Sequence, residues 1–164
     1  MSIIREDRGM GRKGLMILIL TLVSIYPAYA VDGWEANLTV TISTADNKLS
    51  FGQRADAADG IDGKYDVPAL LSGDIRAYFL TEKGNYWRDI KSLTPAETKR
   101  WDIRVESPLK GKIIIIRWNP GNMTAVSVIN LIDRSSGVIM DMKAINSCSY
   151  QNNGVREFSI EVRP

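Results

Sequence analysis

The chain contains no histidine and only one cysteine among its 164 residues. Without histidine there is no imidazole base, no Ser-His-Asp or Cys-His catalytic arrangement, and few of the usual zinc sites. Paired carboxylates remain available for acid and base chemistry, but none stands in a distinctive sequence context. We therefore expect a protein without catalytic activity and without a cofactor, apart from the calcium hypothesis described below.

The single cysteine, Cys148, lies between two serines and excludes an internal disulfide. We expect it to be a small apolar side chain buried in the core. Pairing with another chain, or a reactive thiol, is the alternative.

The first thirty residues have the pattern of a cleavable signal peptide. Four basic residues precede an apolar run from Leu15 to Ile25, and Ala28-Tyr29-Ala30 has the small-x-small form of a cleavage site. We predict cleavage after Ala30, because the run is shorter than the roughly 20 residues of a spanning helix. The mature chain is then exported to the periplasm, the cell surface or the medium, without stable membrane insertion. An uncleaved anchor is the alternative.

Cleavage would also change the charge balance. It removes four basic and two acidic residues from totals of 21 and 19, which leaves 17 of each sign in residues 31–164. A neutral chain lacks the basic footprint typical of proteins that bind nucleic acid or anionic lipid, so we expect neither as a partner. Residues 31–164 suffice for a single domain with its own core.

Most of residues 31–164 have strand patterns. Apolar and polar residues alternate from Trp34 to Ile42, as in a strand with one buried face. Further strand patterns cover residues 49–52, 74–80, 101–106, 112–119, 125–132, 138–143 and 155–163. Turn signals at short spacing predict an all-β, immunoglobulin-like or fibronectin type III-like antiparallel β-sandwich. A closed barrel is the alternative.

Local signals also predict four hairpins and one helical turn. One hairpin pairs residues 125–132 with residues 138–143 across Asp133-Arg134-Ser135-Ser136-Gly137. Asp46-Asn47 favours a turn between the first two strands. Residues 107–111 favour a central hairpin that joins the strands on either side of them. Asn152-Asn153-Gly154 is the strongest hairpin turn in the chain. A capping box with proline predicts a short helical turn at residues 94–97.

Residues 54–73 follow neither periodicity and form an unusually long loop, which is typical of functional or mobile segments. The loop carries four aspartates, three or four residues apart: Asp56, Asp59, Asp62 and Asp66. Their oxygens are a candidate calcium site, although the spacing is not that of an EF-hand. The alternative is a solvated loop in which the aspartates cap turns beside glycines.

Two aromatic residues are candidates for a ligand-binding surface. Tyr86 and Trp87 lie in a polar stretch outside the clear strand patterns. A lid over one end of the core is the alternative. The other tryptophans fall among aliphatic residues and are expected in the core: Trp34, Trp101 and Trp118.

The isoleucine run at residues 113–116 is apolar on both faces of its strand. Ile113 and Ile115 share the face opposite Ile114 and Ile116, with no polar residue between them. This face needs a cover, either from the long acidic loop or from a partner chain. Ile113 and Ile115 are therefore candidate interface residues.

The order of several short motifs is familiar across nearly the whole of residues 31–164. The motifs are Phe51-Gly52, Asp59-Gly60 with Asp62, Asp66-Val67-Pro68, Ala77-Tyr78-Phe79, Asp89-Ile90, Trp101 with Val105, Trp118, Ser149-Tyr150, and Phe158 with Val162. In this order the chain resembles uncharacterised fibronectin type III-like β-sandwich modules of exported bacterial proteins. The resemblance implies a module that binds or scaffolds, and it names no ligand.

These observations predict a non-catalytic exported β-sandwich module that acts in a cell-surface or extracellular assembly. Its partners would be other cell-envelope or extracellular proteins, or further copies of itself. The alternative function is a lectin-like module that binds calcium or carbohydrate through the loop at residues 54–73.

Overall fold

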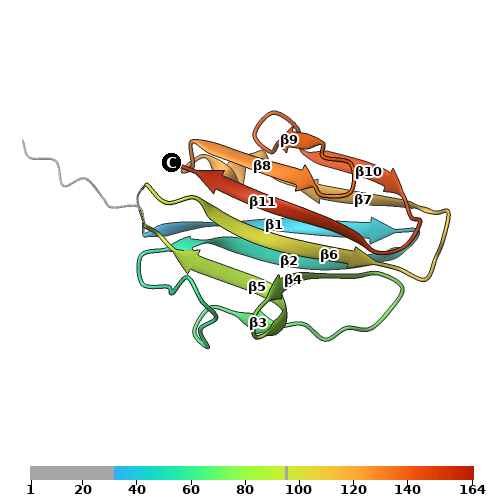
Figure 1. Ribbon diagram of the computed structural model, residues 1–164, viewed down its shortest axis with the longest axis horizontal. Coiled ribbons are helices and arrows are strands. Elements are labelled where there is room, and N and C mark those ends of the chain that lie inside the picture. The colour runs from blue at the N-terminus through green and yellow to red at the C-terminus, as the bar shows by residue number, and fades with distance from the viewer. Residues whose placement is uncertain (1–31, 95) are drawn as a thin grey trace, which may run out of the picture.

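The computed structural model describes residues 32–94 and 96–164 (Figure 1). The predicted signal peptide, residues 1–30, lies outside them. The described part is all-β, with one short 3-10 helix at Pro120–Met123 and no α-helix. The strands are β1 (Gly33–Ile42), β2 (Ala45–Arg54), β3 (Val67–Pro68), β4 (Arg76–Thr81), β5 (Gly84–Ser92), β6 (Lys99–Glu106), β7 (Ile113–Trp118), β8 (Val128–Asp133), β9 (Ile139–Asp141), β10 (Ser147–Gln151) and β11 (Arg156–Arg163). No helix in these two ranges is long and apolar enough to cross a membrane.

All the strands belong to one curled, mixed sheet. Its order is β10-β7-β1-β2-β5-β4-β6-β11-β8-β9, and β3 pairs with β5 off this path. Neighbouring strands run antiparallel except for β2 and β5, which are parallel. The purely antiparallel prediction is wrong at this pair. A parallel pair needs a long crossover, and the segment between β2 and β5, which contains the acidic loop, β3 and β4, supplies it.

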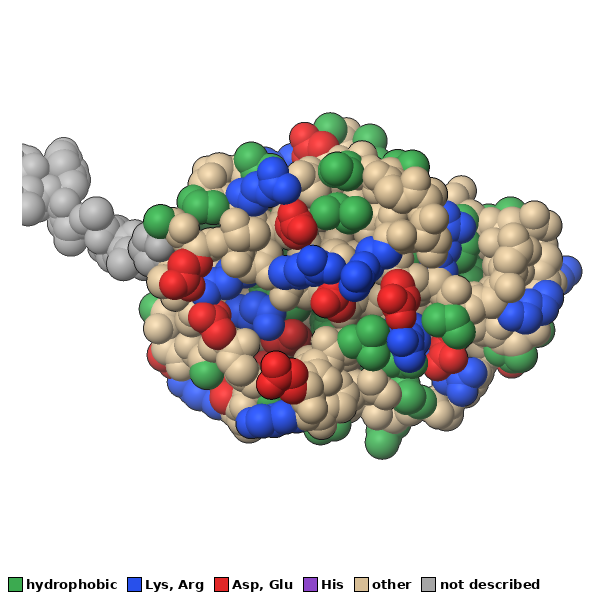
Figure 2. All heavy atoms as spheres, viewed as in Figure 1, with side chains coloured by type: hydrophobic (Ala, Val, Ile, Leu, Met, Phe, Trp, Pro, Cys, Tyr) green, Lys and Arg blue, Asp and Glu red, His purple; other side chains and the backbone are tan. Residues whose placement is uncertain are grey.

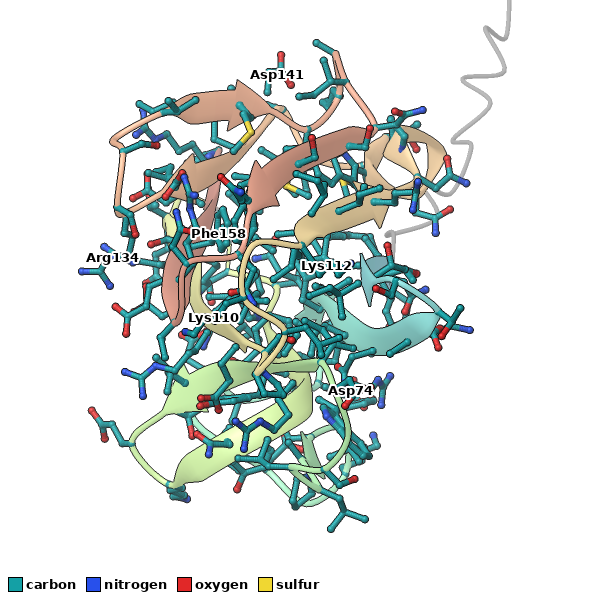
Figure 3. The ribbon with its side chains drawn as sticks, turned by 90° about the vertical axis from the view of Figure 1, so that its right-hand side faces the viewer. Asp74, Lys110, Lys112, Arg134, Asp141 and Phe158 are labelled. Atoms are coloured by element: carbon teal, nitrogen blue, oxygen red, sulfur yellow. The ribbon has the colours of Figure 1, made fainter. Side chains whose placement is uncertain are left out.

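The curl brings the two ends of the sheet together over one core. Trp118 of β7 donates a hydrogen bond from Nε1 to the carbonyl of Met142 at 2.9 Å. The amide of Met142 in turn donates to the carbonyl of Ile129 in β8 at 3.0 Å. Strands from opposite ends of the strand order therefore share the same interior, which Phe158 of β11 enters in Figure 3.

Aromatic rings fill the centre of this core. Trp34 and Trp101 meet edge to face at a centroid distance of 6.3 Å, and Phe51 contacts both of them. Such edge-to-face pairs add stability beyond the area that they bury. Trp34, Trp101 and Trp118 are 8, 1 and 6 % exposed, which confirms their predicted place in the core.

Two of the four predicted hairpins form. One is β8 with β9, which pair antiparallel as predicted, and the other is the first hairpin in the chain. β1 and β2 pair along their whole length, but the turn is Ser43-Thr44, because Ile42 pairs with Ala45. Ser43 adopts a positive φ of +52° there, a conformation that tight hairpin turns often require. Asp46 and its neighbour lie inside β2 instead of forming the turn.

The central hairpin is wrong. β6 pairs with β4 and β11, whereas β7 pairs with β1 and β10. The connection between β6 and β7, which carries Lys110 and Lys112, crosses from one part of the sheet to the other (Figure 3). The side chain of Asn152 is fully buried and holds the crossing in place. Its amide nitrogen, Nδ2, donates hydrogen bonds to the carbonyls of Ser107 and Leu109 at 3.2 and 2.7 Å. Asn152 therefore supports this crossing, and the predicted hairpin at residues 152–154 is also wrong.

Two strands and one helical turn differ from the sequence prediction. β5 lacks a clear alternation of polar and apolar residues, and β10 alternates over only five residues; neither was predicted as a strand. The helical turn at residues 94–97 is not seen in the described residues of that stretch. Ala96 there has a left-handed φ of +68°, which is incompatible with a right-handed helix.

Candidate functional site

The acidic loop does not bring its four carboxylates together. Asp56, at one side, accepts hydrogen bonds from the ammonium of Lys64 and from the hydroxyl of Tyr65, the latter at 2.6 Å. The bond from Lys64 is the main reason that the pKa of Asp56 falls to about 2. Asp56 thus takes part in an exposed pair within the loop.

Asp59 lies on the side of the loop that contacts β5 and β6. Its carboxylate accepts hydrogen bonds from Lys99 at 2.7 and 2.8 Å and from the hydroxyl of Ser92 at 2.7 Å. Lys99 is only 4 % exposed and also donates to Glu97 at 2.7 Å. Burial by itself would raise the pKa of Asp59, but the bonds from Lys99 and Ser92 lower it. Asp59 therefore neutralises a buried ammonium group.

Asp62 and Asp66 satisfy backbone amides. Asp62 accepts hydrogen bonds from the amides of Lys64 and Tyr65, each at 2.9 Å. Asp66 accepts from the amides of Asp62 and Ile90 at 2.7 and 2.9 Å. These are the turn-capping roles of the alternative interpretation.

The calcium hypothesis therefore finds no formed site. Within residues 32–94 and 96–164, no group of three or more His, Cys, Asp or Glu side chains is placed to hold a metal ion. A calcium ion would have to replace the existing bonds of several loop aspartates. The geometry supports a loop shaped by its aspartates.

Tyr86 and Trp87 do not form an exposed aromatic surface. Tyr86 is 9 % exposed and belongs to the core, opposite Phe79 of β4. Trp87 is half-buried against the core, and its buried Nε1 has no hydrogen-bond partner among the described residues. The predicted ligand surface is wrong for Tyr86, because β5 continues as a strand through this stretch and packs it inside.

Ile113 and Ile115 share one face of β7, as predicted. Ile113 is 53 % exposed, Ile115 is half-buried, and Ile114 and Ile116 on the other face are buried. The acidic loop does not cover this face, because its hydrogen bonds run to β5 and β6. Thr41 and Ser149 flank Ile115 on the neighbouring strands.

A polar recess lies elsewhere, where the sheet splits between β5 and β6. β4 pairs with β5 as far as Thr81 and with β6 as far as Leu80, and a groove of about 640 Å³ opens beyond its end. The groove is lined by loop residues 59–61, by the turn at residues 80–83, and by side chains of β5 and β6. Trp101 bridges the split by donating from Nε1 to the carbonyl of Asp89 at 2.9 Å.

Asp89 is the unusual group of this groove. Its pairing with Phe51 of β2 places it on the core face of the sheet, and it is only 3 % exposed. Its charged partner is the ammonium of Lys91 at 3.5 Å, which is long for a hydrogen bond. Burial raises the pKa of Asp89 to about 6, although Lys91 opposes the shift.

This arrangement favours neutral, hydroxyl-bearing ligands over ions. The ionised carboxylate of Asp89 accepts hydrogen bonds, and a hydroxyl group can donate them without bringing a further charge into the groove. The acidic groups Asp59 and Asp102 are already paired with Lys99 and Arg100. The charged side chains that line the groove are of both signs, so they do not create a field of one sign.

The sequence analysis named Asp89 only within the Asp89-Ile90 motif, and neither Asp89 nor Lys91 was a candidate site residue. The usable signal was an aspartate within a run that also holds Trp87 and Ile90, since charged residues rarely stand inside buried strands without a role. The signal was weak because β5 lacks the alternation that would have shown which side chains point inward.

Comparison with protein-family models, with curated proteins and with solved structures finds no significant match for this chain.

Proposed function

We propose that this chain is an exported, non-catalytic module of immunoglobulin-like or fibronectin type III-like sandwich build, which acts in a cell-surface or extracellular assembly through protein contacts. The export pattern of residues 1–30, the lack of histidine, and an all-β body whose sheet ends face each other across one core support this proposal. The partner is another cell-envelope or extracellular protein, or a second copy of the chain.

The observation that carries the proposal is an unguarded sheet edge. β10 ends the strand order, and residues 144–154 around it contain no charged side chain. Edge strands are usually protected by charge, proline or a bulge, because their free backbone groups pair with other strands. Beside this edge, β7 exposes Ile113. An uncharged edge next to an exposed isoleucine is typical of a protein-contact surface.

The face shown in Figure 2 differs from the uncharged edge at β10, because it carries many charged side chains. There, basic and acidic side chains are interspersed. Ion pairs of this kind in β6 and β11 join Arg104 to Glu157 at 2.7 Å and Arg100 to Asp102 at 2.9 Å. Such a mixed, paired surface favours solvation over association. The contrast directs the search for contacts to β10 and β7.

Site-specific photocrosslinking in the native host tests the proposal. A photoreactive residue at position 149 of β10 should give discrete crosslinked products, whereas the same residue at the exposed Lys48 of β2 should not. Ser147→Lys and Ile113→Lys should each reduce the products from position 149, because charge at the contact opposes its burial. Equal products from positions 149 and 48, or none from either, would overturn the proposal.

A second candidate function, carbohydrate binding, is favoured by Asp89 at the floor of the groove. This is the lectin-like alternative, placed where the acidic loop meets β5 and β6 rather than on the loop aspartates. The buried carboxylate retains acceptor sites that sugar hydroxyls can fill. Saccharides of the right class would raise the melting temperature of the protein by binding its native state.

A thermal-shift screen of neutral mono- and oligosaccharides tests this second function. A hit should be lost in Asp89→Ala and kept in Asp56→Ala, since Asp56 lies outside the groove lining. If a saccharide still raises the melting temperature of the Asp89→Ala variant, the groove is not its binding site.

A further inference from the structure

The backbone of β10 has a free side. The amide of Asn152 donates to the carbonyl of Lys112 at 2.8 Å, and the amide of Trp118 donates to the carbonyl of Asn146 at 2.9 Å. In an antiparallel pair, alternate residues make these bonds, so the even-numbered residues of β10 bond to β7. The amides and carbonyls of Ser147, Ser149 and Gln151 therefore point away from β7, and no other described strand pairs with them.

We infer that two copies of this chain associate by antiparallel pairing of β10 with β10 of the second copy, about a two-fold axis at Ser149. This inference rests on the proposed function and names the partner at the proposed contact edge. The resulting interface is isologous, as in most homodimers.

The register follows from the free backbone groups. With Ser149 opposite Ser149 of the partner subunit, Ser147 lies opposite Gln151 of the partner subunit. All three outward-facing residues of each strand then find a partner, which gives about six backbone hydrogen bonds. An axis between Ser149 and Tyr150 would place each outward-facing residue opposite a residue that already bonds to β7. An axis at Tyr150 or at Cys148 would again pair outward-facing residues, but it would leave one of the three in each β10 without a partner in the other β10.

The side chains of β10 suit a copy of the same strand. Ser147, Ser149 and Gln151 are small or neutral and exposed, so like charges do not meet across the axis. Cys148 and Tyr150 are half-buried on the core side, and each would lie opposite the other across the seam. The hydroxyl oxygen of Tyr150 is buried without a hydrogen-bond partner among the described residues.

Charge also argues for a second copy over another occupant. A partner of different sequence is usually selected by complementary charge, and β10 offers none. The other end of the sheet, β9, has only three residues, including the charged Asp141, whereas β10 offers five uncharged residues to a copy of itself. β10 is thus the edge of this sheet that pairs best with itself.

Disulfide trapping tests the register. In a Cys148→Ser background, Ser149→Cys should form a covalent dimer under mild oxidation, because directly opposite residues lie within disulfide range. Ser147→Cys is the matched control and should not form one, since Gln151 of the partner subunit faces it. Adding Gln151→Cys to Ser147→Cys should restore the covalent dimer. Equal trapping of both single cysteines would overturn the register.

Light scattering of the purified protein tests the association itself. The protein should be dimeric or in monomer-dimer exchange at concentrations up to about 1 mM. Ser149→Pro should shift the dissociation constant upward by at least about tenfold, and it should fold normally, because the lost amide points outward on an edge strand. Ser149→Lys should do the same by charge repulsion across the axis.

The outcomes separate this inference from the proposed function. A purified protein that is monomeric throughout, with no trapping at Ser149, overturns the second copy as partner. If position 149 still crosslinks to another protein in the native host, the proposed function survives that result. If neither assay detects a contact at β10, both are wrong.

Discussion

The indole nitrogen of Trp101 donates a hydrogen bond to the main-chain carbonyl of Asp89 at 2.9 Å. This bond joins β6 to β5 beyond the end of β4, where no strand lies between them. It closes the core above Trp101, which is 1 % exposed, and leaves the polar groove outside. One side chain thus separates the apolar interior from the candidate site.

Removal of this bond should destabilise the protein. Trp101→Phe leaves a buried carbonyl without its donor and a small cavity, so we expect a loss of about 2–4 kcal/mol in the free energy of unfolding. Trp87→Phe is the matched control, because the Nε1 of Trp87 has no described partner. It should cost about 1 kcal/mol or less. Urea denaturation of both variants measures the difference, and equal losses would contradict the role of the bond.

The pKa of Asp89 predicts an unusual pH dependence. Burial raises this pKa from 3.8 to about 6, so the ionised carboxylate lowers stability above pH 6, and the cost fades as the pH falls toward 4. Asp89→Asn should therefore raise the free energy of unfolding by up to about 3 kcal/mol at pH 8 and by little near pH 4. The exposed control Asp74→Asn should change stability little at either pH. A uniform loss at both pH values in Asp89→Asn would contradict this account.

Asp133 should contribute with the opposite sign. Burial raises its pKa, but hydrogen bonds from Arg156, Ser136 and the amide of Ser135 outweigh burial and lower the pKa to about 2. Its stabilisation is present above pH 3.8 and is lost as the pH falls toward 2. We expect Asp133→Asn to cost about 3 kcal/mol at pH 7 and much less near pH 2.

An exposed ion pair provides the control for Asp133. Arg163 and Glu161 lie 3.0 Å apart, and the Arg163 side chain is 54 % exposed. Glu161→Gln should therefore cost roughly 0–1 kcal/mol. Acid denaturation curves of both variants and the parent protein test the contrast, and equal costs at pH 7 would sink it.

Gly52 should not tolerate a side chain. A Cβ there would lie 2.1 Å from the carbonyl oxygen of Trp34, a backbone atom of the paired strand β1. Gly52→Ala should thus cost about 3 kcal/mol or more, at the upper end of overpacking effects. Gly60, in the acidic loop, has no atom within 4 Å of such a Cβ, and Gly60→Ala should change the melting temperature little. Similar melting temperatures for the two variants would contradict the close approach.

Cys148 should react slowly with thiol reagents. Burial raises its pKa to about 11, so the thiolate that attacks such reagents is scarce at pH 8. We expect labelling of the native protein to be far slower than labelling in urea. Fast labelling of the native protein would favour the reactive-thiol alternative, and the rate is measured by absorbance with an aromatic disulfide.

The local alternation of polar and apolar residues was sufficient to predict a strand where only one face of that strand is buried. The alternation from Trp34 to Ile42 predicted β1, and the same reasoning placed Trp101 and Trp118 in the core, because a buried face repeats every two residues. Short-range signals failed at the connections. Residues 107–111 and Asn152-Asn153-Gly154 are good turn formers, yet both segments cross the molecule, and the fully buried Asn152 holds the first crossing.

The candidate sites depended even more on long-range pairing. The aspartates of the loop were visible in the sequence, but their separate partners, such as Lys99 for Asp59, come from strands far along the chain. Asp89 became notable only when the parallel pairing of β2 with β5 turned it toward the core.

The periodicity alone was enough to predict an all-β chain, and the composition alone showed that the chain has no histidine. Neither property depends on which strands pair with each other. The pairing of strands is set by the shared core, which is a property of the whole folded chain. That pairing buried Asp89 at a split in the sheet, and it left β10 as an uncharged, unpaired edge.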